Sequence, residues 1–98
     1  MTIKMKKNAQ DVVIEVAGRL DTVTSPALDK TINEDIGDAT NLVLDLKEME
    51  YISSAGLRVL LIAQKKMQKI GSMKVTNVCD AVMDVFEMTG FADILVIE

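Results

Sequence analysis

The chain has 98 residues, 49% of them apolar and 27% charged, and its formal net charge is −4. This length predicts one domain, residues 1–98, with a single modest hydrophobic core. The acidic balance excludes a protein that binds nucleic-acid phosphates, because such proteins need clustered Lys and Arg, and we interpret the short group Lys4, Lys6 and Lys7 as a solvated chain end.

The chain lacks histidine and has one cysteine, Cys79. Disulfide bonds within the chain, cysteine zinc clusters and Ser-His catalysis are thereby excluded, and we expect no metal, no cofactor and no enzyme activity. Cys79 follows Val78 and lies two positions before Ala81, and it is expected to be a small buried side chain. No apolar run approaches the roughly 18 residues that span a bilayer, so we expect a cytoplasmic protein without membrane insertion.

The first predicted element is a hairpin. Residues 11–17 alternate apolar and polar side chains, which predicts a strand that ends at Gly18. Residues 2–6 are predicted to pair with this strand, with Asn8 in the turn.

A helix is predicted next. Ser25 precedes Pro26, and a Pro at the first helical position after a Ser cap is a strong start signal. Gly37 is the predicted stop. The residues expected on the buried side recur at four-residue spacing: Leu28, Ile32 and Ile36.

The second half alternates strands and helices. Residues 42–46 form a nearly continuous apolar run, which is typical of a central strand covered on both faces. A helix from Ser54 to Gly71 follows, then a strand over 73–78, a helix over 79–88 and a last strand over 94–97. The order β-β-α-β-α-β-α-β predicts an α/β fold with a mixed, largely parallel sheet of about five strands and packed helices.

The helix that starts at Ser54 has an apolar pair outside its main stripe. Leu57 and Leu61 project onto the polar arc beside Arg58 and the Ser54 hydroxyl. This grouping predicts a small partner-binding patch with a modifiable group at its edge. Two alternatives stay open: the leucines pack beneath a neighbouring segment, and Ser54 is only a helix cap.

A phosphate on Ser54 is predicted to change binding and to leave the fold intact. The open N–H groups and the dipole at a helix N-terminus favour an anion. A partner that covers this surface would meet nearly two added negative charges.

Three stretches carry a resemblance to a known family: AGRLDTVTSPAL at 17–28, LVLDLKEMEYISSAGLRVLL at 42–61 and MTGFADILVI at 88–97. Through them the chain resembles STAS domains, and among these the single-domain anti-sigma factor antagonists of bacteria. The resemblance implies a STAS-like fold. It also implies that the unphosphorylated protein binds an anti-sigma factor with a serine-kinase fold, that serine phosphorylation releases it, and that a serine phosphatase resets it.

The family's acceptor serine maps onto Ser54. Ser53 stands where many antagonists carry Asp, which leaves two candidate acceptor hydroxyls. Asp21 matches an acidic position that in the family lies near the acceptor. A turn-forming role is the alternative for Asp21. The candidate partner-binding residues are Asp21, Ser53, Ser54, Gly56, Leu57, Arg58 and Leu61. The alternative function is a constitutive STAS adaptor subunit of a lipid-transport or stress-signalling assembly, without phosphorylation.

Overall fold

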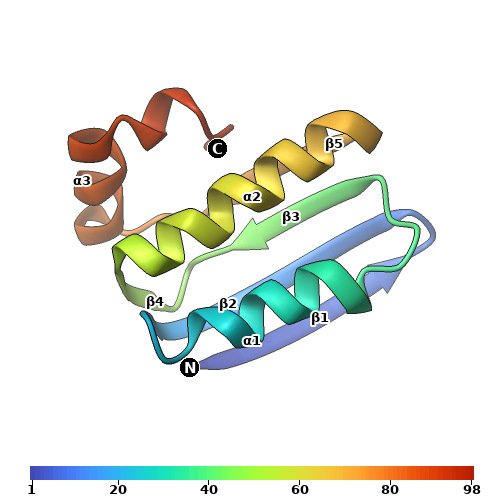
Figure 1. Ribbon diagram of the computed structural model, residues 1–98, viewed down its shortest axis with the longest axis horizontal. Helices are drawn as coiled ribbons and strands as arrows, with labels where there is room; N and C mark the ends of the chain where they lie inside the picture. Colours follow the sequence, from blue (N-terminus) through green and yellow to red (C-terminus); the bar gives the residue numbers. More distant parts are fainter.

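A computed structural model describes residues 1–98 as one mixed sheet with helices packed against it (Figure 1). The strands are β1 (Thr2–Asn8), β2 (Asp11–Leu20), β3 (Asn41–Asp45), β4 (Met49–Ile52) and β5 (Ser72–Thr76). The helices are α1 (Ser25–Lys30) with a π-helical continuation η1 (Thr31–Asp35), α2 (Ser54–Ile70), α3 (Asp80–Thr89) and a 3₁₀ turn η2 (Phe91–Asp93). None of the helices combines the length and the apolar composition that crossing a membrane requires.

The sheet has the strand order β1-β2-β3-β5, and β4 pairs with β2 beyond the end of β3. The β1–β2 pair is antiparallel, whereas β2–β3, β3–β5 and β2–β4 are parallel. The predicted mixed, largely parallel α/β sheet is therefore confirmed. β1 forms one edge of this sheet, and Lys4 and Lys6 lie on alternate positions along it.

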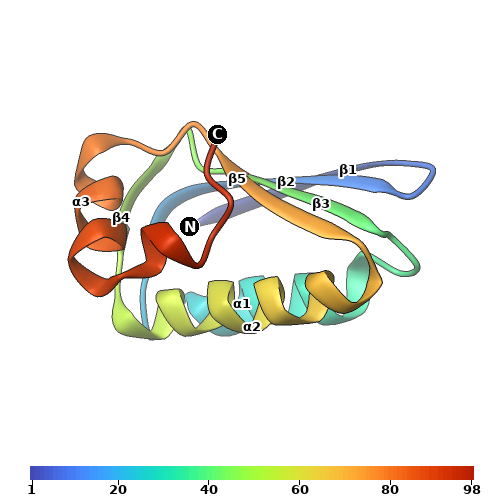
Figure 2. The ribbon, with the colours of Figure 1, turned by 90° about the horizontal axis from the view of Figure 1, so that it is seen from above.

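The sheet is covered on one face only. Figure 2 shows α1 and α2 together on one side of the strands, with the other side uncovered. Along β3, Leu42 and Leu44 are buried whereas Val43 and Asp45 are half-buried. The prediction that this strand is covered on both faces is wrong, because the connections place both long helical segments on the same side.

The predicted hairpin is confirmed, but Asn8 is paired with Asp11 as the last residue of β1, so the turn lies at Ala9 and Gln10. In addition, β2 does not end at Gly18. That residue has φ +92°, and the pairing register shifts between Gly18 and Arg19. A glycine adopts this left-handed conformation without steric cost, so the strand bends here and continues to Leu20.

The first helix begins one residue earlier than expected. Thr24 is the N-cap residue, Ser25 is the first helical residue, and Pro26 follows it. The predicted cap at Ser25 is therefore wrong, and its hydroxyl is buried without a hydrogen-bond partner. The predicted buried side is confirmed, since Leu28, Ile32 and Ile36 are all buried.

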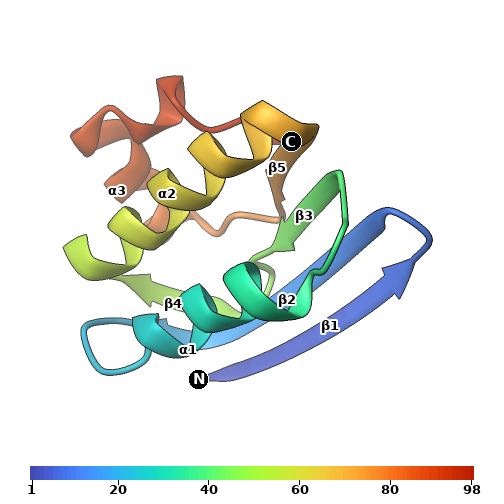
Figure 3. The same cartoon turned by 45° about the vertical axis from the view of Figure 1, so that its right-hand side comes forward.

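The buried arc of α2 is wider than its apolar stripe. Its buried residues are Gly56, Leu57, Val59, Leu60, Ala63, Gln64 and Met67. Ile70, in the last turn, is 48% exposed although it lies on the apolar stripe, whereas Gln64 is only 3% exposed. α3 and the C-terminal segment lie on the side of α2 opposite α1 (Figures 1 and 3).

Two short segments differ from the predictions. β4 was not predicted, because its four residues have two consecutive exposed positions and no alternation. Residues 94–97 form no strand and make only one parallel bridge, between Ile97 and Val75. In this segment Leu95 is buried, whereas Ile94 and Val96 are exposed.

Gly56 allows the first turn of α2 to lie directly on the ends of β2 and β4. A Cβ atom at this position would lie 2.8 Å from Ile52 Cγ1 and 2.9 Å from Leu20 Cγ. Such distances are shorter than van der Waals contact. A side chain here would push the start of the helix away from the sheet.

We expect Gly56→Ala to lower the free energy of unfolding by about 1 to 2 kcal/mol, since the overpacking outweighs the gain in helix propensity. Urea unfolding followed by circular dichroism measures this change. The neighbouring exposed-site variant Ser54→Ala is the control and should stay within about 0.5 kcal/mol of the parent. An unchanged midpoint for Gly56→Ala would show that the helix start has room to move.

Candidate functional site

The candidate site lies where β2 and β4 both end. Leu20 and Ile52 are the last paired residues of these parallel strands, and the Ser53 N–H donates to the Leu20 carbonyl at 2.9 Å. The segments that follow, starting at Asp21 and Ser53, therefore lie side by side at one edge of the sheet. The sequence motif at 17–28 and the serine pair are brought together by this pairing.

The two serines have different roles. Ser53 is the N-cap of α2, and its Oγ accepts from the Gly56 N–H at 3.4 Å, a long bond for this interaction. Ser54 is the first helical residue, is exposed, and makes no side-chain hydrogen bond within the chain. The cap that was expected at Ser54 is thus one residue earlier, because the backbone of Ser53 is extended and its hydroxyl reaches the first turn.

Asp21 organises the neighbouring turn. Its Oδ1 accepts from the Val23 N–H at 3.0 Å and from the Thr24 N–H at 3.1 Å. In return, the Thr24 hydroxyl oxygen accepts from the Asp21 N–H at 2.9 Å. The turn-forming role of Asp21 is therefore present, in a turn that is adjacent to Ser53.

These hydrogen bonds favour the charged form of Asp21. The Thr24 N–H is the largest cause that holds the pKa of this carboxyl below its ordinary value of 3.8. The Thr24 hydroxyl, the Val23 N–H and the positive charge of Arg19 act in the same direction, and partial burial opposes them. A negative charge therefore persists beside the serine pair.

The predicted exposed leucine pair is wrong. Leu57 is only 7% exposed and belongs to the core, and Leu61 is half-buried. Gly56 is also buried, against Leu20 and Ile52. The alternative that the leucines pack beneath the domain's own atoms therefore applies to Leu57, which is part of the hydrophobic core.

Exposed apolar surface beside Ser54 comes instead from a shallow groove between α1 and α2. It has a volume of about 250 Å³. The groove is lined by Thr22, Ser25, Pro26, Asp29, Ala55, Arg58, Val59 and Ile62. Ile62 is 48% exposed, so this groove offers apolar area together with one cation, Arg58, and one carboxylate, Asp29.

Sequence reasoning identified only Arg58 among the groove residues. A signal for Ile62 was present, since it is an apolar residue outside the core stripe of α2. The contribution of Pro26 and Asp29 has no local signal, because it depends on how α1 lies against α2.

A contact between Arg19 and Tyr51, which the sequence did not predict, also lies near the serines. The Arg19 guanidinium lies 4.1 Å from the centroid of the Tyr51 ring, across the β2–β4 pair. Both side chains are exposed. Such cation–π contacts at exposed positions are worth about 0.5 to 1 kcal/mol, so the pair stiffens the surface two residues before Ser53.

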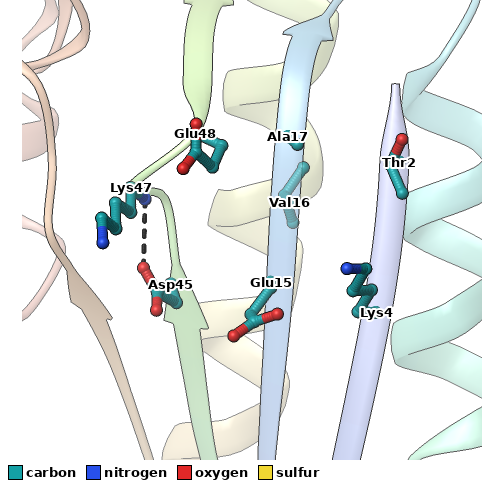
Figure 4. Close-up of a pocket in the computed structure, with 8 residues that line it drawn as sticks. All are labelled: Thr2, Lys4, Glu15, Val16, Ala17, Asp45, Lys47 and Glu48. Atoms are coloured by element: carbon teal, nitrogen blue, oxygen red, sulfur yellow. Dashed lines mark hydrogen bonds between the residues drawn. The ribbon is translucent and has the colours of Figure 1, made fainter.

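A separate hollow of about 270 Å³ lies on β1, β2 and the β3–β4 connection (Figure 4). It is lined by Thr2, Lys4, Glu15, Val16, Ala17, Asp45, Lys47 and Glu48. Lys4 is paired in register with Glu15, and the Asp45 carboxylate accepts from the Lys47 N–H at 3.0 Å. Opposite charges are thus neighbours in this hollow, and none of the predicted site residues lines it.

The arrangement at the serine pair suits two roles, a hydroxyl that accepts an anionic group and a surface on which a partner protein can dock. Ser54 presents a free hydroxyl at the start of a 17-residue helix, beside a charged turn and a partly apolar groove. A dianion at that position is favoured by the helix dipole and by N–H groups of the first turn.

The chain is similar to known proteins over almost its whole length. Residues 2–98 match the STAS domain family. The anti-sigma-B factor antagonist of Bacillus subtilis is 29% identical over 96 residues, which cover 97% of this chain and 88% of the relative. The anti-sigma-B factor antagonist of Listeria monocytogenes is 30% identical over 101 residues, which cover 100% and 89%.

The fold is similar to that of a solved relative. The crystal structure of an anti-sigma factor antagonist from Mycobacterium paratuberculosis superposes with a TM-score of 0.87 at 28% identity. The match covers 98% of this chain and 83% of that one.

The different roles of the serines predict different stabilities. We expect Ser53→Ala to lower the free energy of unfolding by about 0.5 to 1 kcal/mol through loss of the cap, and Ser53→Asp to retain the parent value, since Asp is an equally good cap. Ser54→Ala should change it by less than about 0.5 kcal/mol. Thermal or urea unfolding of the three variants measures the contrast, and equal losses for both alanine variants would contradict the assignment of the cap.

Asp21 should titrate below its ordinary pKa of 3.8. Because its pKa in the folded protein is depressed, its contribution to stability is present above pH 3.8 and is lost as the pH falls below that value. Carboxyl ¹³C NMR measures the midpoint, and the amide protons of Val23 and Thr24 should follow it. Asp21→Asn should lose that titration, whereas a midpoint at or above 3.8 in the parent would exclude these bonds in solution.

Proposed function

Because this chain belongs to the STAS domain family, we propose that it is an anti-sigma factor antagonist, a non-enzymatic protein that binds an anti-sigma factor and thereby regulates transcription that depends on a sigma factor. Relatives that carry this name align with almost the whole chain. The observation that carries the proposal is the exposed Ser54 hydroxyl at the first residue of α2, beside the Asp21 turn and the α1–α2 groove.

The proposed partner is an anti-sigma factor with a serine-kinase fold. It binds the unphosphorylated protein and transfers the γ-phosphoryl group of ATP to Ser54. In this step the Ser54 Oγ–phosphorus bond forms, the bond from phosphorus to the ADP leaving group breaks, and the serine proton passes to a base of the kinase. A serine phosphatase restores the free hydroxyl by hydrolysis.

Ser54 is the preferred acceptor over Ser53. The Ser53 hydroxyl is half-buried and occupied by the cap, whereas Ser54 is exposed and free. A kinase must reach the oxygen and align it with the phosphorus, so an oxygen held against the first turn is a poor acceptor. Ser53 thus supplies the capping acceptor that an Asp at this position would also supply.

Phosphorylation acts on binding and leaves the fold intact. A dianion at the start of α2 lies where the dipole favours it, by about 0.3 to 1 kcal/mol. A partner seated over Ser54 would have to desolvate or approach this charge while the Asp21 carboxylate lies nearby. A penalty of about 2.8 kcal/mol lowers affinity a hundredfold.

The chain itself offers no catalytic group at the serines. It has no histidine, and the only side-chain hydrogen bond at the pair is the one from the Gly56 N–H to Ser53. A serine nucleophile requires a base within hydrogen-bond reach. Ser54 is therefore proposed as a substrate of a kinase and of a phosphatase.

Incubation with the cognate anti-sigma kinase and ATP should add one phosphate per chain, seen by intact mass. Ser54→Ala should abolish the addition, and Ser53→Ala should retain it because the acceptor is still present. The phosphorylated chain should bind the kinase at least about a hundredfold more weakly than the unmodified chain.

Two results would contradict the proposal. Phosphate found on Ser53 would reassign the acceptor. A chain that accepts no phosphate from such a kinase, but forms a stable complex with a transporter ATPase, would identify a constitutive adaptor.

A further inference from the structure

Arg58 is a free cation one helical turn after Ser54. It is exposed, and the chain's two ion pairs join Lys7 with Asp38 and Lys74 with Glu98. Its guanidinium is therefore uncommitted within the chain.

The helix geometry places Arg58 between Ser54 and the α1–α2 groove. At about 100° per residue, Arg58 lies about 40° around the helix axis from Ser54. In the same direction, the groove residues Ile62 and Ala55 lie about 80° and 100° from Ser54. Arg58 itself lines the groove. Residues at i and i+4 have their Cβ atoms about 6 Å apart, so the long Arg side chain can reach either place.

We propose that Arg58 couples the modification of Ser54 to the groove. Without phosphate, Arg58 offers its guanidinium to a carboxylate of the partner that docks in the groove. With phosphate on Ser54, Arg58 pairs with the phosphate and is withdrawn from the groove. This inference rests on the proposed function, since it assumes that Ser54 is the acceptor.

The charges favour this exchange. An anion that lies N-terminal to a cation at i and i+4 is the better orientation for a helix pair, and phosphate with Arg forms strong, often bidentate hydrogen bonds. In the unmodified groove, the charge of Arg58 balances that of Asp29. When Arg58 turns to the phosphate, Asp29 is left as the groove's only charge, so a carboxylate of the partner loses its cation and meets repulsion.

The other cations of α2 are too distant to replace Arg58. Lys65 is exposed and lies 11 positions after Ser54, which corresponds to about 16 Å along the helix axis. Removal of Lys65 therefore changes the net charge by the same amount without touching the proposed pair, which makes it a matched control.

The test uses the full chain with phosphoserine incorporated at position 54 during synthesis, so no kinase is needed. The second pKa of the phosphate is measured by ³¹P NMR titration. Arg58 favours the dianion, so we expect Arg58→Gln to raise this pKa by about 0.4 or more. Lys65→Gln should leave it within about 0.1, and Arg58→Lys should retain part of the effect.

Equal pKa values in the parent, Arg58→Gln and Lys65→Gln would overturn the proposal, as would equal rises in the two variants. A second readout, the Nε–H signal of Arg58, should shift between the unmodified and the phosphorylated chain, and an unchanged signal would also overturn it. Failure of the kinase to modify Ser54 would contradict the proposed function and would leave these titrations interpretable.

Discussion

The parallel pairing of β2 with β4, completed by the Ser53 N–H that donates to the Leu20 carbonyl, is the constraint on which the site depends. It brings two segments that are about thirty residues apart in the chain to one edge of the sheet, the Asp21 turn and the start of α2. Gly56 completes the arrangement because it lets the helix lie directly on both strand ends. A shift in this pairing would separate the charged turn from the serines.

Because two serines are adjacent, one hydroxyl caps the helix while the other stays available for modification. Ser53 satisfies an open N–H of the first turn, and Ser54 is left with an exposed hydroxyl that has no structural duty. Modification of Ser54 therefore costs the fold no internal hydrogen bond. Its consequences fall on the surface, where the Asp21 turn and Arg58 also lie.

Much of the fold follows from local signals. The hairpin, the buried side of the first helix and the bounds of α2 and α3 follow from alternation, four-residue spacing and stop signals at glycines. The burial of Leu57 and Gln64, outside the main apolar stripe of α2, does not follow from such signals, because it depends on how the rest of the chain covers the helix. The serine pair and Asp21 could be found in the sequence, whereas the groove required knowledge of how α1 and α2 lie together.

Lys4 and Lys6 of β1 affect how two copies of this chain can associate. β1 is an edge strand, and its outer backbone groups are open to pairing with another strand. In an antiparallel contact of two copies centred on Met5, Lys4 of each copy would lie directly opposite Lys6 of the other. Like charges in that position repel, so this edge resists the strand-to-strand association that leads to aggregation.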